Sequence, residues 1–334
     1  MHSQEELKQI LSESPECFSA LCEMAALYRQ AHNYAGCFAM VERAIASHEA
    51  TPNDADESTY QELRRLHAHL LRNHLPEILG PIYQLIDLKW MPVFKYGRPR
   101  EMAWRIHSLN LEYLEPSLAS HQLKRLRYLY LSIDSNADRI LEILSHRIPK
   151  SLRSLNIHFN TIPSEAVFHQ FWSQYHGTEE LGHIQSLKIR MPRLTDAGAL
   201  LIRKAFNQLE DLSFESRDRQ GITPLMCEYL ADDVQSNALH RLSLVGTSIG
   251  DQGLYALVSS PNMKQLQALD LRDGTLTNTA AKLLTAETDL PKLVSVDLRY
   301  NAIDPAGVNM LEKCSFPVNA ENQHERPSDD EGQK

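Results

Sequence analysis

The sequence lacks the features that would place the chain in or across a membrane. No run of about 18 apolar residues occurs anywhere, and the N-terminal stretch MHSQEELKQI has no apolar segment of the kind that a signal peptide carries. We therefore expect neither a membrane-spanning helix nor export, and we expect no contact with a membrane.

Cysteine is scarce and irregularly spaced. The chain has five cysteines, an odd number, and none of them form a C-x-x-C pair. They are Cys17, Cys22, Cys37, Cys227 and Cys314. A disulfide framework or a cysteine-based zinc site would need paired spacing. The pattern predicts reduced thiols in a cytoplasmic protein.

Positive charge is in deficit. Lys and Arg number 34 against 43 Asp and Glu, which gives a net charge of −9 and a pI near 5.9. This balance argues against a nucleic-acid partner held by a general phosphate-binding field. Apolar residues at 43% and charged residues at 23% are ordinary for a globular protein. The length allows two domains or one elongated array.

Catalytic and metal-binding motifs are missing as well. We find no G-x-S-x-G elbow, P-loop, G-x-G-x-x-G or H-E-x-x-H. The chain has 15 histidines, but His67, His69 and His74 on one predicted helix have spacings that do not bring three imidazoles together. We expect no cofactor, no metal and no enzymatic activity; a hydrolase without a recognisable motif is the least favoured alternative. Trp90 and Trp104 are expected in the core.

The last third of the chain repeats one pattern three times, with openings 27 residues apart at 239, 266 and 293. The copies are Leu239-x-x-Leu242-x-Leu244, Leu266-x-x-Leu269-x-Leu271 and Leu293-x-x-Val296-x-Leu298. The L-x-L core alternates apolar and polar residues as a strand does, and the residues from Ile249 to Leu257 change to helical spacing. Each unit is therefore predicted to be strand, turn and helix, and such units must stack to bury their apolar faces.

Looser copies of the pattern precede these three. They open at Leu126, Leu152, Ile184 and Leu209, and a first copy, Ile106-x-x-Leu109-x-Leu111, is assigned to the cap. Seven full strands at about 4.8 Å spacing predict an inner face roughly 30 Å long. Because neighbouring units stack, polar residues far apart in sequence are expected to lie side by side on that face.

This pattern and its period resemble those of leucine-rich repeat proteins. Three helix openings are similar to those of the ribonuclease-inhibitor-like subclass, whose convex side is helical. They are Thr195-Asp196-Ala-Gly198, Ile249-Gly-Asp-Gln-Gly253 and Ile303-Asp304-Pro305-Ala-Gly307. The resemblance implies an α/β solenoid: a ribonuclease-inhibitor-like horseshoe with a parallel β inner face and an α-helical convex face.

One position departs from the repeat pattern. Three residues after the last apolar strand position, leucine-rich repeats usually have asparagine. Here that position holds Asp134, Asn160, Pro192, Arg217, Thr247, Gly274 and Asn301. The amide ties neighbouring turns together, so its loss predicts an irregular or strained middle of the array.

Residues 3–50 read as three helices. Ser3 and Glu6 have capping-box spacing, and Ser14-Pro15 is typical of a helix N-cap followed by proline at the first helical position. Asn33 marks the break before the third helix. A further helix is predicted over about residues 58–74. Residues 4–97 resemble the repeat-companion domain that precedes repeat arrays in certain bacterial proteins. The resemblance rests on Glu5-Glu6-Leu7 with Ile10-Leu11, the Leu27-Tyr28 helix, Leu79-Gly80-Pro81 and Phe94-Lys-Tyr-Gly97.

This resemblance implies no activity, and the segment is expected to be an all-α N-terminal cap that hides the apolar end of the array. The predicted division is therefore 1–104 for the mainly helical cap, 105–315 for the solenoid and 316–334 for a disordered polar tail.

The candidate site follows from the alternation of strand residues. Side chains on either side of the last apolar strand position point to solvent on the concave face. Within these rows we distinguish an aromatic zone, a basic zone and a zone of paired charges. The predicted partner-binding residues are Tyr128, Tyr130, His158, Lys188, Arg190, Glu215, Asp270, Arg272, Asp297 and Arg299. For the paired zone, the alternative is that Asp and Arg on adjacent strands form cross-strand ion pairs that only solvate the sheet.

These observations predict a monomeric scaffold that grips another protein on its concave face and performs no chemistry. A different class of function stays open, namely a regulator of an enzyme. Such a regulator would be either a nuclease-inhibitor-like protein or a GTPase-activating leucine-rich repeat protein. Since one fold can host many functions, the fold alone does not choose between them.

Overall fold

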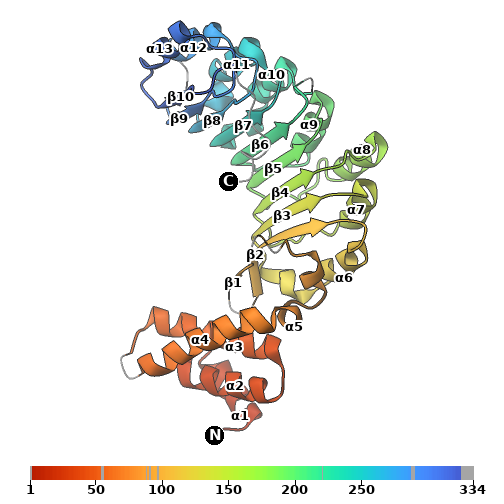
Figure 1. The fold of residues 1–334 in the computed structure, drawn as a ribbon, viewed down its shortest axis with the longest axis vertical. Coiled ribbons are helices and arrows are strands. Elements are labelled where there is room, and N and C mark those ends of the chain that lie inside the picture. Colours follow the sequence, from red (N-terminus) through yellow and green to blue (C-terminus); the bar gives the residue numbers. More distant parts are fainter. Residues whose placement is uncertain are drawn as a thin grey trace. The chain divides into compact units, whose positions relative to one another are not determined.

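The structure is a computed structural model. It describes residues 2–53, 56–87, 89, 92–95, 98–219, 221–286 and 290–324. The chain forms two compact units, Met1–Leu129 and Tyr130–Lys334. Figure 1 shows the elements of both units, and each unit is described by itself below.

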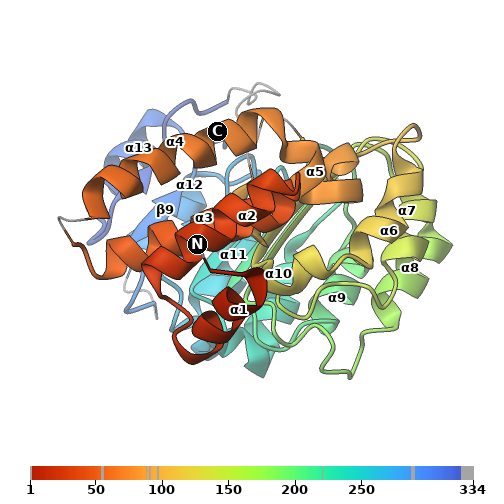
Figure 2. The same cartoon turned by 90° about the horizontal axis from the view of Figure 1, so that it is seen from below.

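The first unit is mostly helical. Its helices are α1 (Gln4–Glu13), α2 (Phe18–Gln30), α3 (Tyr34–Ala50), α4 (Glu57–Asn73), α5 (Leu75–Leu79) and α6 (Leu114–Leu118). Its short 3-10 turns are η2 (Gly80–Leu85), η3 (Leu111–Tyr113) and η4 (His121–Arg125). Helices α2, α3 and α4 lie side by side (Figure 2). The predicted capping box is present, because Ser3 Oγ accepts from Glu6 N at 3.3 Å and the Glu6 carboxylate accepts from Ser3 N at 2.6 Å.

The expectation of an all-α cap is wrong, because this unit contains an antiparallel pair of strands, β1 (Val93–Lys95) and β2 (Arg98–Ile106). Along β2, Met102, Trp104 and Ile106 are buried at every second position, and this is the spacing of a strand. Trp104 is in the core as predicted, whereas Trp90 lies outside the described residues. The compact unit also extends past the boundary predicted after residue 104, because α6 packs on η2 and η4 packs on β2.

Two local predictions in this unit are corrected by the backbone. Ser14-Pro15 does not start a helix: the Ser14 N–H donates to Ile10 O at 2.8 Å and ends α1. The first copy of the repeat pattern, at residues 106–111, is not a strand. Asn110 folds the chain into a turn by accepting from His107 N and donating to Arg105 O, and Leu109 is 83% exposed.

The second unit alternates strands and helices. Its strands are β3 (Tyr128–Ile133), β4 (Ser154–Phe159), β5 (Ser186–Met191), β6 (Asp211–Ser216), β7 (Arg241–Val245), β8 (Ala268–Asp270), β9 (Ser295–Asp297) and β10 (Val318–Asn319). Its helices are α7 (Ala137–Leu144), α8 (Glu165–Ser173), α9 (Asp196–Lys204), α10 (Pro224–Asp232), α11 (Gly250–Val258), α12 (Asn278–Thr285) and α13 (Pro305–Leu311). The seven strands predicted from Leu126 onward are confirmed, and the architecture is an α/β solenoid.

The strands lie in sequence order in one sheet, and β4 to β10 are parallel. Helices α7 to α13 cover one face of this sheet (Figure 1). We call the other face the open face; it is the predicted concave face. Strand residues alternate between buried and partly exposed, as in β4 and β6, so every second side chain belongs to the open face. Each fully buried leucine on the helix-covered face contributes about 1.5–3 kcal/mol.

A repeated contact links the starts of successive helices. The carboxylate of Asp196 in α9 accepts from Thr223 N at 2.9 Å and from Thr223 Oγ1 at 2.6 Å, and Thr223 is the N-cap of α10. Asp251 in α11 holds Thr277, the N-cap of α12, in the same way. Because these N-caps are fixed by the preceding helix, the repeat of α9 is tied to that of α10, and the repeat of α11 to that of α12, on the helical side.

The middle of the sheet is regular, contrary to the irregularity expected from the loss of asparagine. Pairing runs from β4 through β7 without a register shift. Asn301 alone shows the full set of turn-linking bonds in the described residues, accepting from Gly274 N and Leu276 N and donating to Leu271 O and Leu298 O. The N-cap contacts supply links between repeats that the sequence pattern did not reveal.

The segment 316–334 is not wholly a disordered tail. Val318 and Asn319 form β10, which pairs with β9, and Leu298 N donates to Asn319 O at 2.7 Å. Gln323 then bonds to Leu298 O and Ile303 N. This polar stretch satisfies backbone groups that the last repeat would otherwise expose. The part of the predicted tail from residue 325 onward lies outside the described residues.

No helix in the described part of the chain is both long and apolar enough to span a membrane.

Candidate functional site

Strand register brings most of the predicted site residues into two rows on the open face. The first row aligns Asn156, Lys188, Ser213, Ser243, Asp270 and Asp297. The second aligns His158, Arg190, Glu215 and Val245. Nine of the ten predicted residues, Tyr130 to Arg299, belong to the second unit and to this face. Tyr128 begins β3 but falls within the first compact unit, so it is left out of the clusters below.

The first cluster, which we call the basic cluster, consists of Lys188, Arg190, Glu215, Arg217 and His158. Lys188 Nζ is 3.4 Å from Glu215 Oε2, and Arg190 Nε is 3.1 Å from Glu215 Oε1. One carboxylate therefore serves two cations. The Arg190 and Glu215 side chains are only 9% and 14% exposed, whereas Lys188 is 40% exposed. The charge excess is positive and partly desolvated, which strengthens its interactions.

His158 is a neutral member of this cluster. Its Nδ1 lies 3.2 Å from the Tyr130 hydroxyl, which joins the predicted aromatic zone to the basic one. Burial, and then the nearby guanidinium groups of Arg190 and Arg217, lower the pKa of His158 to about 4. The imidazole is therefore uncharged at neutral pH, and the positive charge of the cluster comes from Lys188 and the arginines.

Arg217 is a member that the sequence prediction of the site missed. The repeat pattern places Arg217 at the asparagine position of the turn rather than on the binding surface. A signal was available, since Arg217 lies two residues after Glu215 and four after Ser213, on the alternation that defines the open face. The side chain is exposed, and no ion pair to it is found among the described residues.

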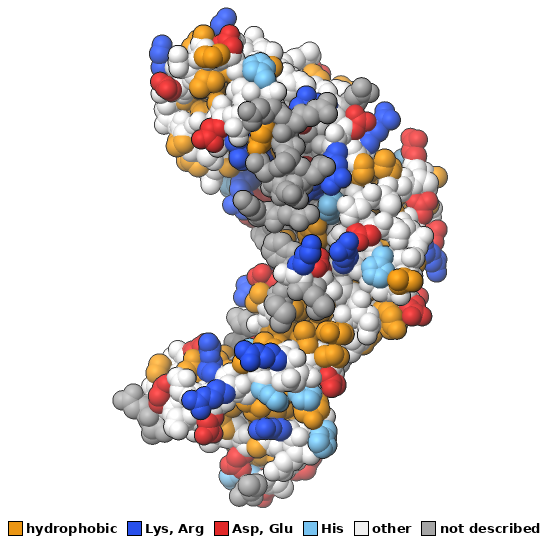
Figure 3. All heavy atoms as spheres, in the orientation of Figure 1, with side chains coloured by type: hydrophobic (Ala, Val, Ile, Leu, Met, Phe, Trp, Pro, Cys, Tyr) orange, Lys and Arg blue, Asp and Glu red, His pale blue; other side chains and the backbone are white. Residues whose placement is uncertain are grey.

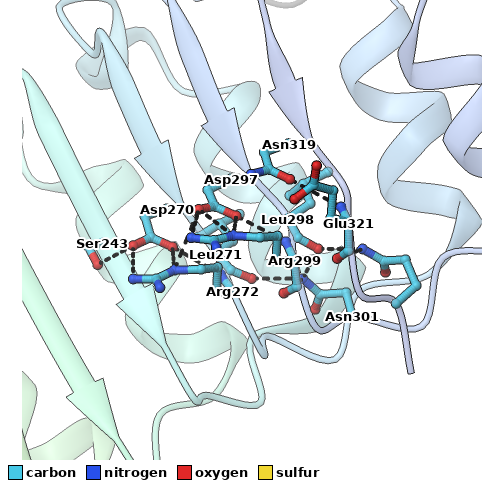
Figure 4. A network of polar contacts seen from close by, with 11 residues as sticks. Ser243, Asp270, Leu271, Arg272, Asp297, Leu298, Arg299, Asn301, Asn319 and Glu321 are labelled. Atoms are coloured by element: carbon cyan, nitrogen blue, oxygen red, sulfur yellow. Dashed lines mark hydrogen bonds and ion pairs between the residues drawn. The ribbon is translucent and has the colours of Figure 1, made fainter. Parts of the chain in front are cut away.

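The second cluster, the paired zone, consists of Asp270, Arg272, Asp297 and Arg299 (Figure 4). Arg272 binds Asp270 through Nε and Nη2, both at 2.9 Å, and Arg299 binds Asp297 through Nε at 3.1 Å and Nη2 at 2.8 Å. Each aspartate also accepts the backbone N–H of its own arginine. Hydrogen bonds to the aspartates raise the pKa of both arginines.

The prediction that these pairs form between adjacent strands holds only in part. The hydrogen-bonded pairs join residues two apart on the same strand end, and one longer contact, Arg272 Nε to Asp297 Oδ2 at 3.6 Å, crosses between strands. The short Asp-x-Arg spacing allows the carboxylate to meet backbone and guanidinium together, which a cross-strand partner cannot do. The zone is electrically neutral and all four side chains are about a quarter exposed.

Charge elsewhere is mixed. On the face of the molecule seen in Figure 3, Lys and Arg side chains are interspersed with Asp and Glu in both units, with no large field of one sign. In the described residues, no group of three or more His, Cys, Asp or Glu side chains is placed to hold a metal ion. All five cysteines are among the described residues and all are free.

Comparison with known proteins gives one family match. The leucine-rich repeat model matches residues 235–258 and 289–311, which contain β7 with α11 and β9 with α13. These are two of the three units that show the 27-residue period. No curated protein matches the chain in sequence.

Among solved structures, the chain is similar to a protein from Bacteroides fragilis, with 17% identity and a TM-score of 0.52 over 69% of this chain and 67% of that one. At this identity the likeness concerns the fold alone. The crystal structure of Rad7 with Elc1 in yeast matches at 15% identity and a TM-score of 0.34, over 100% of this chain and 98% of that one. The second score is too low to support an argument.

Proposed function

We propose that the chain is a leucine-rich repeat protein, supported by the two matched repeats and the sheet order. In this proposal it is a non-enzymatic interaction scaffold that binds a partner protein on the open face of its sheet. The proposed contact residues are Tyr128, Tyr130, His158, Lys188, Arg190, Glu215, Asp270, Arg272, Asp297 and Arg299, to which Arg217 is added. The partner is another protein, and the scaffold acts as a monomer in the cytoplasm.

The observation that carries this proposal is the alignment of polar side chains by strand register. Residues more than 100 positions apart in sequence, such as His158 and Asp297, stand on one face because each repeat adds a strand beside the last. Backbone pairing fixes these side chains before a partner arrives, which lowers the entropy cost of binding. Tyrosine and arginine, which this face carries, are the residue types enriched at interface hot spots.

We propose that the open face catalyses no reaction because its acidic side chains are already engaged in contacts within the chain. Glu215 contacts two cations, and Asp270 and Asp297 each hold an arginine and a backbone N–H. A carboxylate engaged in this way is poorly placed to take a proton from a substrate, because its oxygens already contact cations or accept hydrogen bonds. Binding by multiple fixed contacts needs no such base.

Finer assignments belong to the same proposal. The helix that follows each strand supports membership of the ribonuclease-inhibitor-like subclass. The helical first unit supports an N-terminal cap like the bacterial repeat-companion domain. Five free cysteines support a reducing compartment.

The test is capture of a partner by tagged wild-type chain, followed by mass spectrometry. A variant with Lys188→Glu and Arg217→Glu should lose the partner, whereas Lys282→Glu, an exposed lysine of α12 on the helical side, should retain it. Circular dichroism should show equal folding of both variants. If only the Lys282→Glu variant lost the partner, the interface would lie on the helical side instead of the open face. A captured enzyme whose rate changes on binding would favour the regulator alternative.

A further inference from the structure

We propose that the basic cluster binds an acidic segment of the partner, with an Asp or Glu carboxylate of that segment seated on Arg190, Lys188 and Arg217. The inference rests on the proposed function and names the chemistry of the docking segment. Three features of the cluster carry it: the charge balance, the unused donors of a buried arginine, and the contrast with the paired zone.

The charge balance leaves positive charge without a counter-ion. Lys188 and Arg190 share one carboxylate, Glu215, while Arg217 lies near His158, which contributes no charge. A further acid that acts on His158 is Asp134, on the turn after β3, whose Oδ1 accepts from Ser132 Oγ at 3.1 Å and from Asn160 Nδ2 at 2.7 Å. Counting Asp134 as well, the cluster keeps a net positive charge, so an incoming carboxylate would be attracted.

The guanidinium group of Arg190 has N–H donors without a hydrogen-bond acceptor, although the side chain is buried. Its side chain is more than nine-tenths buried, yet its one ion pair in the described residues is the Nε contact with Glu215. That contact lacks hydrogen-bond geometry, so Nε is buried without an acceptor. The two terminal nitrogens are not among the buried atoms and donate to no described residue. A buried donor without an acceptor destabilises a fold, and a guanidinium fork matches a carboxylate with two parallel bonds. A docked carboxylate would accept from the two terminal nitrogens, which Glu215 leaves free.

In the paired zone, on the same face, the arginine guanidinium groups do have hydrogen-bond acceptors within the chain. Arg272 and Arg299 each take their own aspartate through two nitrogens. A partner's carboxylate would have to compete with those internal bonds. At the basic cluster it would only add to a single shared carboxylate, so the acidic segment is assigned to strands β5 and β6.

The experiment uses a fluorescent peptide of Glu and Ser, capped at both ends, and its counterpart with Gln in place of Glu. Binding to the full chain is measured by fluorescence anisotropy at low salt. We expect the Glu peptide to bind at least about tenfold tighter than the Gln peptide, and Lys188→Gln and Arg217→Gln each to weaken it about tenfold, the loss of one charge-assisted contact. Arg241→Gln is the matched control: this arginine is 69% exposed, pairs with Asp211 and lies outside the cluster.

Three results would overturn the inference. The first is equal affinity for the two peptides or no binding of either. The second is an equal loss in Arg241→Gln, which would mean attraction by charge in general. The third is binding of the Glu peptide only after Asp329→Asn, Asp330→Asn and Glu331→Gln, which would make the chain's own C-terminal segment the occupant.

Capture of the natural partner separates this inference from the proposed function. If wild type, Lys188→Gln and Arg217→Gln recover the same partner equally, while Arg272→Glu loses it, the open face binds but not through the basic cluster. If removal of charge anywhere on the open face leaves recovery unchanged, the proposed function itself fails. Loss of the partner with Lys188→Gln and Arg217→Gln, and retention with Arg241→Gln, supports both.

Discussion

The basic cluster and the paired zone both combine arginines with carboxylates on the same sheet face, yet the charges are paired differently in each. In the paired zone each Arg has an Asp two residues away, and carboxylate, guanidinium and backbone N–H close on one another. In the basic cluster Lys188 and Arg190 share Glu215 across strands, and Arg190 keeps unused donors. Charged side chains alone therefore do not mark a binding site; their state of pairing does.

The difference has a structural cause. Asp and Arg at positions i and i+2 meet at the end of one strand, so the pair forms within a single repeat. Glu215 reaches its partners only because β5 and β6 are in register, with Arg190 directly opposite Glu215. The first arrangement is local, whereas the second depends on the stacked array.

The largest expected effect comes from removing the shared carboxylate. Glu215→Gln leaves Arg190 buried without a counter-charge, and we expect a loss of about 3 kcal/mol in the free energy of unfolding. Asp297→Asn in the paired zone should cost no more than about 1 kcal/mol, because its partner is partly solvated. Urea unfolding of both variants and of the wild type measures the two losses in the free energy of unfolding. Equal losses would erase the distinction between the two zones.

A second prediction concerns partner binding. Reversing charge with Arg217→Glu should weaken partner affinity about tenfold to a hundredfold, since it adds repulsion as well as removing attraction. The fold should be unaffected, because Arg217 is exposed. Surface plasmon resonance with the captured partner gives the affinity, and unchanged binding with unchanged stability would remove Arg217 from the site.

A third prediction concerns the paired zone. Arg272→Gln should lower the free energy of unfolding by less than about 1 kcal/mol, because the ion pair is partly exposed and Asp270 keeps its bonds to Arg272 N and Ser243 Oγ. Thermal unfolding measures this loss. A loss of several kcal/mol in the free energy of unfolding would mean that the paired zone stabilises the fold of the last repeats.

The effect that is smallest at neutral pH is a pH dependence at the basic cluster, which appears only under acid conditions. The folded pKa of His158, about 4, lies below the unfolded value near 6.5, so the unfolded chain binds more protons between these pH values. The contribution of His158 to stability is therefore fully present above about pH 6.5 and is lost as pH falls toward 4. His158→Gln should reduce the slope of unfolding free energy against pH in that window. An unchanged slope would contradict a neutral, buried imidazole.

The strands and their facing could be predicted because they depend on local periodicity. The repeated Leu-x-Leu core placed Lys188, Glu215 and Asp297 on one face before any pairing was known, and the structure gives the same register. Helix starts with a local cap were predictable for the same reason: Asp304 caps α13 and Asn33 caps α3 as expected.

The features that escaped prediction are those that depend on contacts between distant segments. The β1–β2 pair lies in a segment that read as part of a helical cap, and β10 forms because a polar segment meets the open edge of β9. The Asp196–Thr223 clasp and the Arg190–Glu215 contact join residues 27 and 25 positions apart. No local pattern distinguishes such pairs from solvated surface residues.

The central claim, that the open face binds the partner, is tested most directly by acetylation footprinting of lysines in the captured complex. Lys188 on the open face and Lys282 on the helical side both reach solvent in the free chain. We predict that the partner slows acetylation of Lys188 and leaves that of Lys282 unchanged. Protection of Lys282 with Lys188 still reactive would contradict the account.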